Sequence, residues 1–386
     1  MIVTVTLNAA LDTTYRVGDV DWDGVNRVHE VHRRAGGKGV NVARVLSSLG
    51  HEILATGLAG GPTGQAILAD LDAAGLPHAF TPIAGESRAT LVISSVVRGD
   101  AGTAGGGAAG ARRAGTAGDG EFRGASGGEE LRDAGGSGEF RGASGGEELQ
   151  DAGGSGEFRG AGGGEEFRDA GGSGEFRGAG GAGRTALFNE PGPEVTDEEL
   201  GNFLTSWEAR VKTADAVVIS GSLPRGVPVD FYATLARVAA GHGVPVIVDA
   251  DGEPLRHAPE GRPAIVKPNH EELARAVPGC GPAEAAQVLR SRGAGSVVVS
   301  MGKDGLLAVT PDGDFLARMP YTVAGNPTGA GDALVAGLAL GLVEATPWPE
   351  RLRRAAALGA AAVAAPVAGD FDHTVFTDIH HKITIT

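Results

Sequence analysis

The stretch NPTGAGDALVAG at 326–337 carries the clearest chemical signal in the sequence. Gly329, Ala330 and Gly331 lead into an apolar helix, so we expect backbone N–H groups and the positive end of the helix dipole to form an anion site there. Asp332 follows directly, and a carboxylate beside an anion site is unfavourable unless it handles a proton or positions a hydroxyl. The stretch therefore predicts an acid–base residue at an anion-binding turn, with a plain helix start capped by Asp332 as the alternative.

A second glycine motif, AGGKGVN at 35–41, opens another predicted helix. Gly36 and Gly37 allow a ligand to approach the backbone, and Lys38 and Asn41 project from the first helical turn. The motif lacks the G-K-[ST] ending of a Walker A loop and the G-x-G-x-x-G pattern of a dinucleotide site. It indicates a ligand-binding turn, and a surface turn with a solvated lysine is the alternative.

Two further motifs and two arginines suggest sugar and phosphate contacts. Asp12 ends LNAALD and could accept hydrogen bonds from sugar hydroxyls or simply form a turn, and SGSLPRG at 220–226 reads as a phosphate or sugar loop or as a plain turn. Arg27 and Arg88 fall on predicted ribbon strands. Either could clamp a phosphate through two parallel hydrogen bonds, and surface charge is the alternative for each.

The motif VKPNHEE at 266–272 places Lys267, Asn269 and Glu272 at the end of a predicted strand. Glu272 could hold a magnesium ion through water, or it could be a solvated acid in the first turn of a helix.

The motif VSMGKDG at 299–305 also ends a predicted strand. Gly302 and Gly305 suit a chain that lies against a nucleotide phosphate, and a β-hairpin turn is the alternative.

Apolar strands that alternate with helices are predicted to position these motifs. Strands are expected at 2–7, 53–58, 88–97, 216–220, 244–250, 264–269 and 296–302, with ribbons at 13–34 and 305–323 and strand character again from 184. Helices are expected at 38–49, 63–74, 229–240, 270–276, 282–292, after 329 and at 349–364. This order implies a parallel sheet covered on both faces, with ligands beyond the carboxyl ends of its strands.

The composition argues against several classes of protein. The 386 residues are 41% hydrophobic and carry a formal net charge of −15, so the chain can bury a large core and is a poor candidate for nucleic-acid binding. Cys280 is its only cysteine, which excludes an internal disulfide and disfavours a cysteine-based zinc site. The sequence shows no signal-peptide pattern and no run of about 18 apolar residues. We therefore expect a cytoplasmic protein with no membrane or nucleic-acid partner.

The motifs LNAALD, AGGKGVN, SGSLPRG, VKPNHEE, VSMGKDG and NPTGAGD resemble, in order and spacing, those of the PfkB (ribokinase-like) carbohydrate kinases. The sequence is most similar to the 1-phosphofructokinase and tagatose-6-phosphate kinase branch, of which NEPGP at 189–193 is typical. The resemblance covers nearly everything outside 99–184. It implies a single α/β kinase domain over 1–386, a ribokinase-like three-layer sandwich with a mostly parallel sheet and a small β-sheet lid.

The resemblance also implies a role for each candidate residue. Asp332 would position and deprotonate the acceptor hydroxyl, and the amides of Gly329, Ala330 and Gly331 would stabilise the transferring phosphoryl group. The residues implied for substrate binding are Asp12, Gly36, Gly37, Lys38 and Asn41, with Arg27 and Arg88 on the sugar phosphate. Those implied for nucleotide binding are Lys267, Ser300, Gly302 and Gly305. Asn269 and Glu272 would support Mg²⁺ through water.

Two departures from the family pattern lie next to these contacts. Ala9 stands where the family usually has proline, and Pro327 and Thr328 stand where it usually has another pair. Both sites adjoin the expected substrate or anion, so they leave the identity of the sugar open without affecting the chemistry.

An 18-residue repeat within 99–184 replaces the short turn that joins two lid strands in the family. Phe122, Phe140, Phe158 and Phe176 mark the same position in successive copies. A chain so rich in glycine cannot bury enough apolar area to offset its ordering entropy. We expect a disordered acidic insertion, and a solenoid or partner-binding segment is the alternative.

The implied function is ATP- and Mg²⁺-dependent phosphorylation of a ketohexose phosphate, fructose 1-phosphate first, with fructose 6-phosphate and tagatose 6-phosphate as further candidates. ATP would lie across 299–305 and the Ala-rich helix, and lid strands near 13–34, 88–97 and 184–190 would exclude water. We also expect a homodimer formed through the lid. The alternatives are a kinase of an unphosphorylated sugar or nucleoside, a non-catalytic sugar-phosphate sensor, and an interaction protein that works through its repeat.

Overall fold

The computed structural model describes residues 1–18, 20–21, 23–95 and 185–386. The strands are β1 Ile2–Thr6, β2 Ala10–Val17, β3 Glu30–Gly36, β4 Ile53–Gly60, β5 His78–Ile83, β6 Arg88–Ser95, β7 Thr185–Asn189, β8 Ala216–Ser220, β9 Val246–Asp249, β10 Ile265–Val266, β11 Ser296–Ser300, β12 Leu306–Thr310, β13 Gly313–Arg318 and β14 Thr384–Ile385. The helices are α1 Lys38–Ser48, α2 Gly61–Ala73, α3 Asp197–Val211, α4 Phe231–Gly241, α5 Gly252–His257, α6 His270–Ala276, α7 Pro282–Ser291, α8 Ala330–Val343, α9 Trp348–Val363 and α10 His373–His380. The predicted insertion falls outside the described residues.

Within the described residues, ten strands form the main sheet in the order β14-β13-β12-β11-β10-β9-β8-β1-β4-β5. The pairs from β11 to β5 are parallel, and only the edge formed by β12, β13 and β14 is antiparallel. The order places β1, β8, β9 and β10 side by side, so their carboxyl ends meet at one edge. This mostly parallel sheet confirms the predicted fold class.

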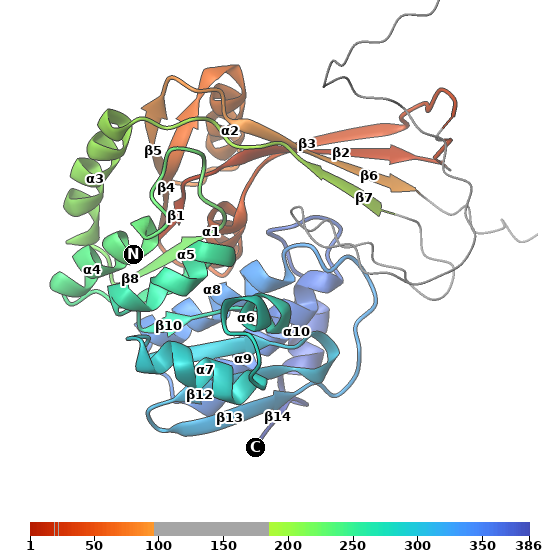
Figure 1. Ribbon diagram of the computed structural model, residues 1–386. Helices are drawn as coiled ribbons and strands as arrows, with labels where there is room; N and C mark the ends of the chain where they lie inside the picture. The colour runs from red at the N-terminus through yellow and green to blue at the C-terminus, as the bar shows by residue number, and fades with distance from the viewer. Residues whose placement is uncertain (19, 22, 96–184) are drawn as a thin grey trace, which may run out of the picture. The chain divides into compact units, whose positions relative to one another are not determined.

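Helices lie on both faces of the main sheet (Figure 1), and alternate residues of the central strands pack into two different cores. On one face Ile2, Val218 and Ile247 share a core with α1, α2, α8, α9 and α10. On the other, Val3 and Val217 share a core with α3 to α7. Strands buried on both faces are read as continuous apolar runs, which is why β1 and β8 were predictable from sequence.

A second sheet of the described residues has the strand order β3-β2-β6-β7 and projects from the main sheet (Figure 1). Strand β2 pairs parallel with β6, and the outer pairs β2–β3 and β6–β7 are antiparallel. Strands β6 and β7 form where strand structure was predicted, in the described parts of 88–97 and 184–190. In the 13–34 ribbon the strands begin earlier and end later than predicted, and residues 18–29 form their connection.

Several elements differ from the sequence predictions. The strand expected at 264–269 is only Ile265–Val266, because Pro268 cannot donate to a ladder and Asn269 already caps α6. The prediction omitted α3, although Thr196 and Glu199 form a capping box at its start. It also omitted β5, α5, α10 and β14, of which β14 is only two residues long and gives little periodic signal.

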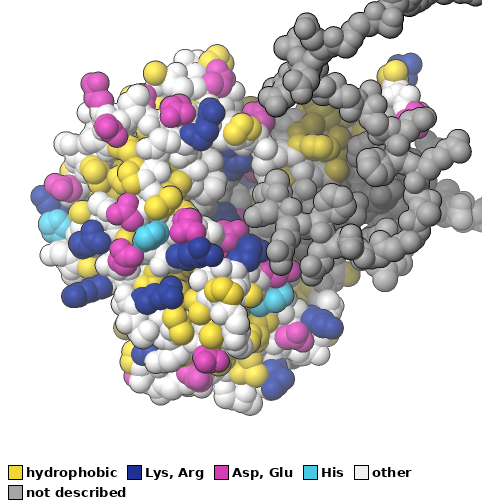
Figure 2. Space-filling model, in the orientation of Figure 1, with side chains coloured by type: hydrophobic (Ala, Val, Ile, Leu, Met, Phe, Trp, Pro, Cys, Tyr) yellow, Lys and Arg dark blue, Asp and Glu magenta, His cyan; other side chains and the backbone are white. Residues whose placement is uncertain are grey.

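The described surface mixes both signs of charge. On the face shown in Figure 2, Lys and Arg side chains lie interspersed with Asp and Glu side chains. Every helix in the described part of the chain is too short or too polar to cross a bilayer.

Candidate functional site

The start of α8 forms the turn that the sequence predicted as an anion site. Gly329 precedes the helix with a φ of 87°, and a Cβ atom there would lie 2.9 Å from Ala368 Cα, so both conformation and packing favour glycine. The Ala330 amide donates to the Pro327 carbonyl at 3.1 Å. Among the described residues, the amides of Gly329, Gly331 and Asp332 have no acceptor, which leaves them for a ligand.

Asp332 is buried in the first turn of α8, and its Oδ2 accepts a hydrogen bond of 2.8 Å from Asn41 Nδ2 on α1. Burial raises the pKa of Asp332 to about 7, and the negative charge of Asp249 adds to this rise. Lys38, the Asn41 hydrogen bond and Lys267 oppose it. A carboxyl group with a pKa near neutrality is suited to accept a proton at physiological pH.

Two lysines share one buried carboxylate at the carboxyl ends of β9 and β10. Asp249 Oδ1 lies 3.3 Å from Lys38 Nζ and 3.2 Å from Lys267 Nζ, and Glu272 Oε1 lies 3.9 Å from Lys38 Nζ. Burial opposes the charge of Asp249, but the two ammonium groups outweigh it and hold its pKa below the usual value. A Cβ atom on Gly331 would lie 3.3 Å from Lys267 Nζ, so this ammonium group lies against the α8 turn.

Burial also opposes the charge of Lys38, yet the carboxylates of Asp249, Glu272 and Asp332 raise its pKa above the usual value. Lys38 therefore stays protonated, and Lys267 Nζ lies beside the unpartnered amide of Gly331, so the cluster contains cationic groups that can contact a phosphate.

Asn269 and Glu272 form a capping box at the start of α6. Asn269 Oδ1 accepts from the Glu272 amide and Glu272 Oε2 accepts from the Asn269 amide, both at 2.7 Å. Glu272 is buried, so the alternative of a solvated acid is wrong. Its Oε1 and the buried, unpartnered Oδ2 of Asp249 are oxygen ligands of the kind that Mg²⁺ or its water shell prefers. Among the described residues, no group of three or more His, Cys, Asp or Glu side chains is arranged to hold a metal ion.

Asp12 lies on β2 opposite Arg34 of β3. Its side chain covers Gly36, where a Cβ atom would lie 1.9 Å from Asp12 Oδ2. Burial raises the pKa of Asp12 to about 6, while a hydrogen bond with Thr90 and nearby arginines, Arg88 first, oppose the rise. Gly37 follows with a φ of 107°, which few other residues adopt.

Arg88 begins β6 and is half-buried beside Asp12. Its Nε donates to the Asn8 carbonyl at 3.3 Å, and Asn8 Nδ2 donates to Ser222 Oγ at 3.0 Å. The loop predicted at 220–226 therefore meets the LNAALD segment through Ser222. The structure thus brings Asp12, Arg88 and this loop together at the carboxyl ends of β1 and β8.

The residues predicted for the nucleotide fall into two groups. Lys267 belongs to the charged cluster, and Ser300 pairs with Asn269 in a parallel bridge beside it. Gly302 lies in an exposed 3₁₀ turn with a φ of 57°. Gly305 has a φ of 92°, and a Cβ atom there would lie 1.9 Å from the Ala317 carbonyl oxygen, so packing against β13 alone explains this glycine.

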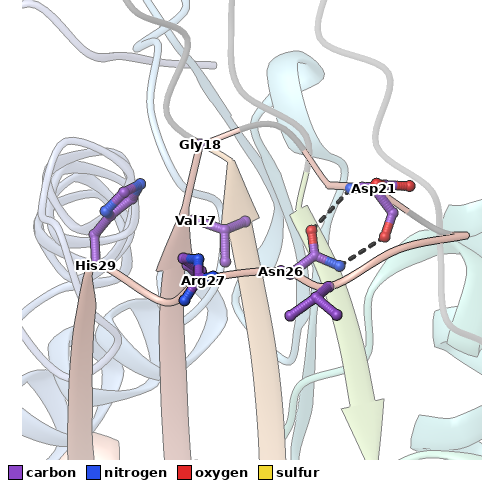
Figure 3. Close-up of a pocket in the computed structure, with 7 residues that line it drawn as sticks. Val17, Gly18, Asp21, Asn26, Arg27 and His29 are labelled. Carbon is purple, nitrogen blue, oxygen red and sulfur yellow. Dashed lines mark hydrogen bonds between the residues drawn. The ribbon is translucent and has the colours of Figure 1, made fainter. Parts of the chain in front are cut away.

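Arg27 does not lie on a strand, contrary to the sequence prediction. It lies in the connection between β2 and β3, where it lines a surface pocket with Val17, Gly18, Asp21, Val25, Asn26 and His29 (Figure 3). The β2–β3 ladder runs from Ala10–Gly36 to Arg16–Glu30, so the connection follows its far end. At a rise of about 3.3 Å per residue, roughly 13 Å of strand separate Asp12 from Arg16 alone. Arg27 therefore does not join the other candidates within this chain.

The profile of the pfkB family of carbohydrate kinases matches residues 5–108 and 180–374. The chain belongs to the pfkB family. Solved structures with the same fold include phosphofructokinase-2 from Escherichia coli in complex with potassium, at 24% identity and a TM-score of 0.70, over 99% of this chain and 98% of that one. A possible 1-phosphofructokinase from Thermotoga maritima matches at 22% identity and a TM-score of 0.70, over 100% and 98%. Ribokinase from Arabidopsis thaliana matches at 16% identity and a TM-score of 0.59, over 98% of each chain.

Sequence reasoning did not single out Asp249 in this pfkB-family kinase. The available signal was the run VIVD, a buried strand that ends in an acid. Such an acid is expected at the ligand-binding edge of a parallel sheet. Its pairing with Lys38 and Lys267 depends on strand order, which the local pattern does not contain.

Proposed function

We propose that this kinase transfers the γ-phosphoryl group of ATP to a hydroxyl of a ketohexose phosphate, with fructose 1-phosphate as the favoured acceptor. The observation that carries the proposal is the meeting of Asp332, Asn41 and the unpartnered α8 amides with Lys38 and Lys267. Phosphoryl transfer depends mainly on positioning and charge stabilisation, and this arrangement supplies both. We further propose that it works in the cytoplasm, where ATP and sugar phosphates are available.

In the proposed mechanism, Asp332 accepts the proton of the acceptor hydroxyl as the new P–O bond forms. Asn41 orients the Asp332 carboxylate, and the α8 amides together with Lys267 stabilise the charge on the transferring group. We assign the nucleotide to the side of the site that carries Lys267, Ser300 and Gly302. When bound, Mg²⁺ would neutralise phosphate charge, and Glu272 and Asp249 would hold its water shell, with Asn269 fixing Glu272.

Asp249 is proposed as the residue that positions both lysines. Its single Oδ1 holds Lys38 from the amino-terminal half and Lys267 from the carboxyl-terminal half of the sequence. It thereby holds two cations at one carboxylate oxygen, and Lys267 Nζ lies against the α8 turn.

The proposed sugar-phosphate specificity depends on Arg88. Its side chain lies next to Asp12, and the Asn8 carbonyl holds its Nε, so its remaining N–H groups can receive a phosphate. The Escherichia coli phosphofructokinase-2, at 24% identity, has been solved with fructose 6-phosphate, which supports a ketohexose phosphate as the acceptor class. Asp12 would accept hydrogen bonds from the sugar hydroxyls.

An ADP-release assay over sugars, nucleosides and sugar phosphates tests the proposal. We expect turnover with ketohexose phosphates that needs Mg²⁺, and we expect Arg88→Met to raise the KM for the sugar phosphate about tenfold to a hundredfold, since hydrogen bonds to charged groups contribute about 1.5–3 kcal/mol. Arg16→Met, on the neighbouring strand, is the matched control. Turnover only with unphosphorylated sugars or nucleosides would contradict the proposed sugar-phosphate acceptor. No turnover with any acceptor would favour the alternative of a non-catalytic sugar-phosphate sensor.

We also propose a homodimer formed through the small sheet. Its described strands expose large apolar side chains, with Val31 48% and Phe188 50% accessible. Phosphofructokinase-2 from Escherichia coli, at 24% identity, has been solved in a tetrameric form. The molar mass in solution should equal two chains, and Phe188→Glu should reduce it to one. Val229→Glu, which replaces an equally exposed valine away from this sheet, should leave it at two; a single-chain mass for the unmodified protein would contradict the proposal.

A further inference from the structure

The ion pair between Arg34 and Asp370 joins two segments 336 positions apart in the sequence. Arg34 Nη1 and Nη2 donate to the two carboxylate oxygens of Asp370 at 3.1 and 2.7 Å, and Nη1 also donates to the Ala368 carbonyl at 3.1 Å. The planar guanidinium matches a carboxylate in this forked geometry only over a narrow range of orientations. The contact therefore fixes how β3 meets the segment that follows α9.

This segment, residues 364–370, packs against the proposed catalytic groups. Ala368 packs so closely on Gly329 that a Cβ atom there would lie 2.9 Å from Ala368 Cα. A Cβ atom on Gly369 would lie 3.1 Å from Asn41 Oδ1, and the same Asn41 donates to Asp332. A shift of the segment would therefore displace the α8 turn and change the orientation of Asp332.

Arg34 also reaches the proposed sugar side of the site. It stands opposite Asp12 in the β2–β3 ladder, and its positive charge is one of those that oppose the raised pKa of Asp12. Arg34 thus connects two parts of the proposed site. It lies opposite Asp12, which is proposed to hold the acceptor, and it contacts the 364–370 segment that packs next to the α8 turn.

We propose that Arg34 is a positioning residue, which through Asp370 and Ala368 aligns Asp332 with the acceptor bound beside Asp12. The inference rests on the proposed function. The Arg34 side chain is 26% exposed and that of Asp370 is 47% exposed, so their ion pair contributes little to global stability. Its effect is expected in kinetics, where small displacements of reacting groups are costly.

Three single variants separate positioning from charge. Arg34→Ala removes the fork and also a positive charge near Asp12, whereas Asp370→Asn removes the carboxylate but keeps that charge. Arg33→Ala is the matched control, because Arg33 is an exposed arginine on the same strand.

We expect Arg34→Ala and Asp370→Asn each to lower kcat about tenfold with the KM for ATP unchanged, because both misplace Asp332. The double variant should be no slower than either single one, since both break one contact. Arg33→Ala should behave as the unmodified protein does. Normal kinetics for Asp370→Asn would overturn the proposal and assign the effect of Arg34→Ala to its charge on Asp12.

Hydrogen exchange gives a second readout that does not depend on turnover. In Asp370→Asn the hydrogen-bonded amides of Ala330, Ala364 and Ala365 should exchange faster than in the unmodified protein or in Arg33→Ala. Unchanged exchange would overturn the proposal. An unmodified chain that is inactive on every acceptor would instead contradict the proposed function, while exchange would still decide whether this contact holds the segment.

Discussion

Replacing Asp332 with asparagine is expected to lower kcat about 10³-fold with little change in the KM for ATP. Asparagine keeps the shape of the side chain but cannot accept the proton of the acceptor hydroxyl, and a positioned base contributes roughly 10²- to 10⁴-fold. Steady-state kinetics with the best acceptor of the panel would measure the effect. Glu344→Gln, which removes an acid at the C-cap of α8, should leave kcat unchanged.

The pH profile provides an independent check on Asp332. Burial raises its pKa to about 7, so the ionised form required of a base is lost as the pH falls through that value. In the unmodified protein kcat/KM should rise with pH up to about 7 and then level off. Asp332→Asn should lose this ascending limb. Near-normal turnover in Asp332→Asn, or an unchanged limb in that variant, would show that another group takes the proton.

Replacing Asp249 with asparagine should produce the second large effect. Lys38 and Lys267 would lose the carboxylate they share, and removing one partner of a buried ion pair typically costs about 3–5 kcal/mol of stability. Misplaced lysines should also lower kcat about a hundredfold. Denaturant unfolding and kinetics of the folded variant measure the two effects separately.

The same variant should shift the pH profile in a defined direction. The charge of Asp249 helps to raise the pKa of Asp332, so its removal should move the ascending limb to lower pH. Asp251→Asn is the matched control, because Asp251 follows two residues later but is exposed and pairs with Arg275. A stable, fully active Asp249→Asn with an unmoved limb would contradict the positioning role.

The sequence predicted the helix starts and central strands of this kinase well, because each depends on residues close together in the sequence. Glycines before an apolar run predicted the α8 turn, and Lys38 and Asn41 were correctly placed in the first turn of α1. Continuous apolar runs predicted the central strands. Even so, the pattern did not distinguish Gly305, whose small size is required by β13, from a glycine kept for a ligand.

Features that depend on tertiary contacts could not be read in the same way. Asp249 and Asp370 are ordinary acids in sequence, and only strand order and the path after α9 bring them to Lys38 and to Arg34. Arg27 shows the converse, because a basic residue near the ribbon looked suitable while the length of the β2–β3 ladder separates it from Asp12. Whether the two sides of a site meet is decided by topology rather than by composition.

The hydrogen bond between Asn41 and Asp332 has a consequence for how the protein folds during its synthesis. The two residues stand 291 positions apart, and Arg34 and its partner Asp370 are separated by an even longer stretch of sequence. During synthesis the amino-terminal strands can form first, because Asp332 emerges from the ribosome 291 residues after Asn41 and residues 364–370 follow later still. Contacts of such long range form late in folding. A nascent chain would therefore hold its sugar-binding residues long before it could transfer phosphate, and unfinished copies would not consume ATP.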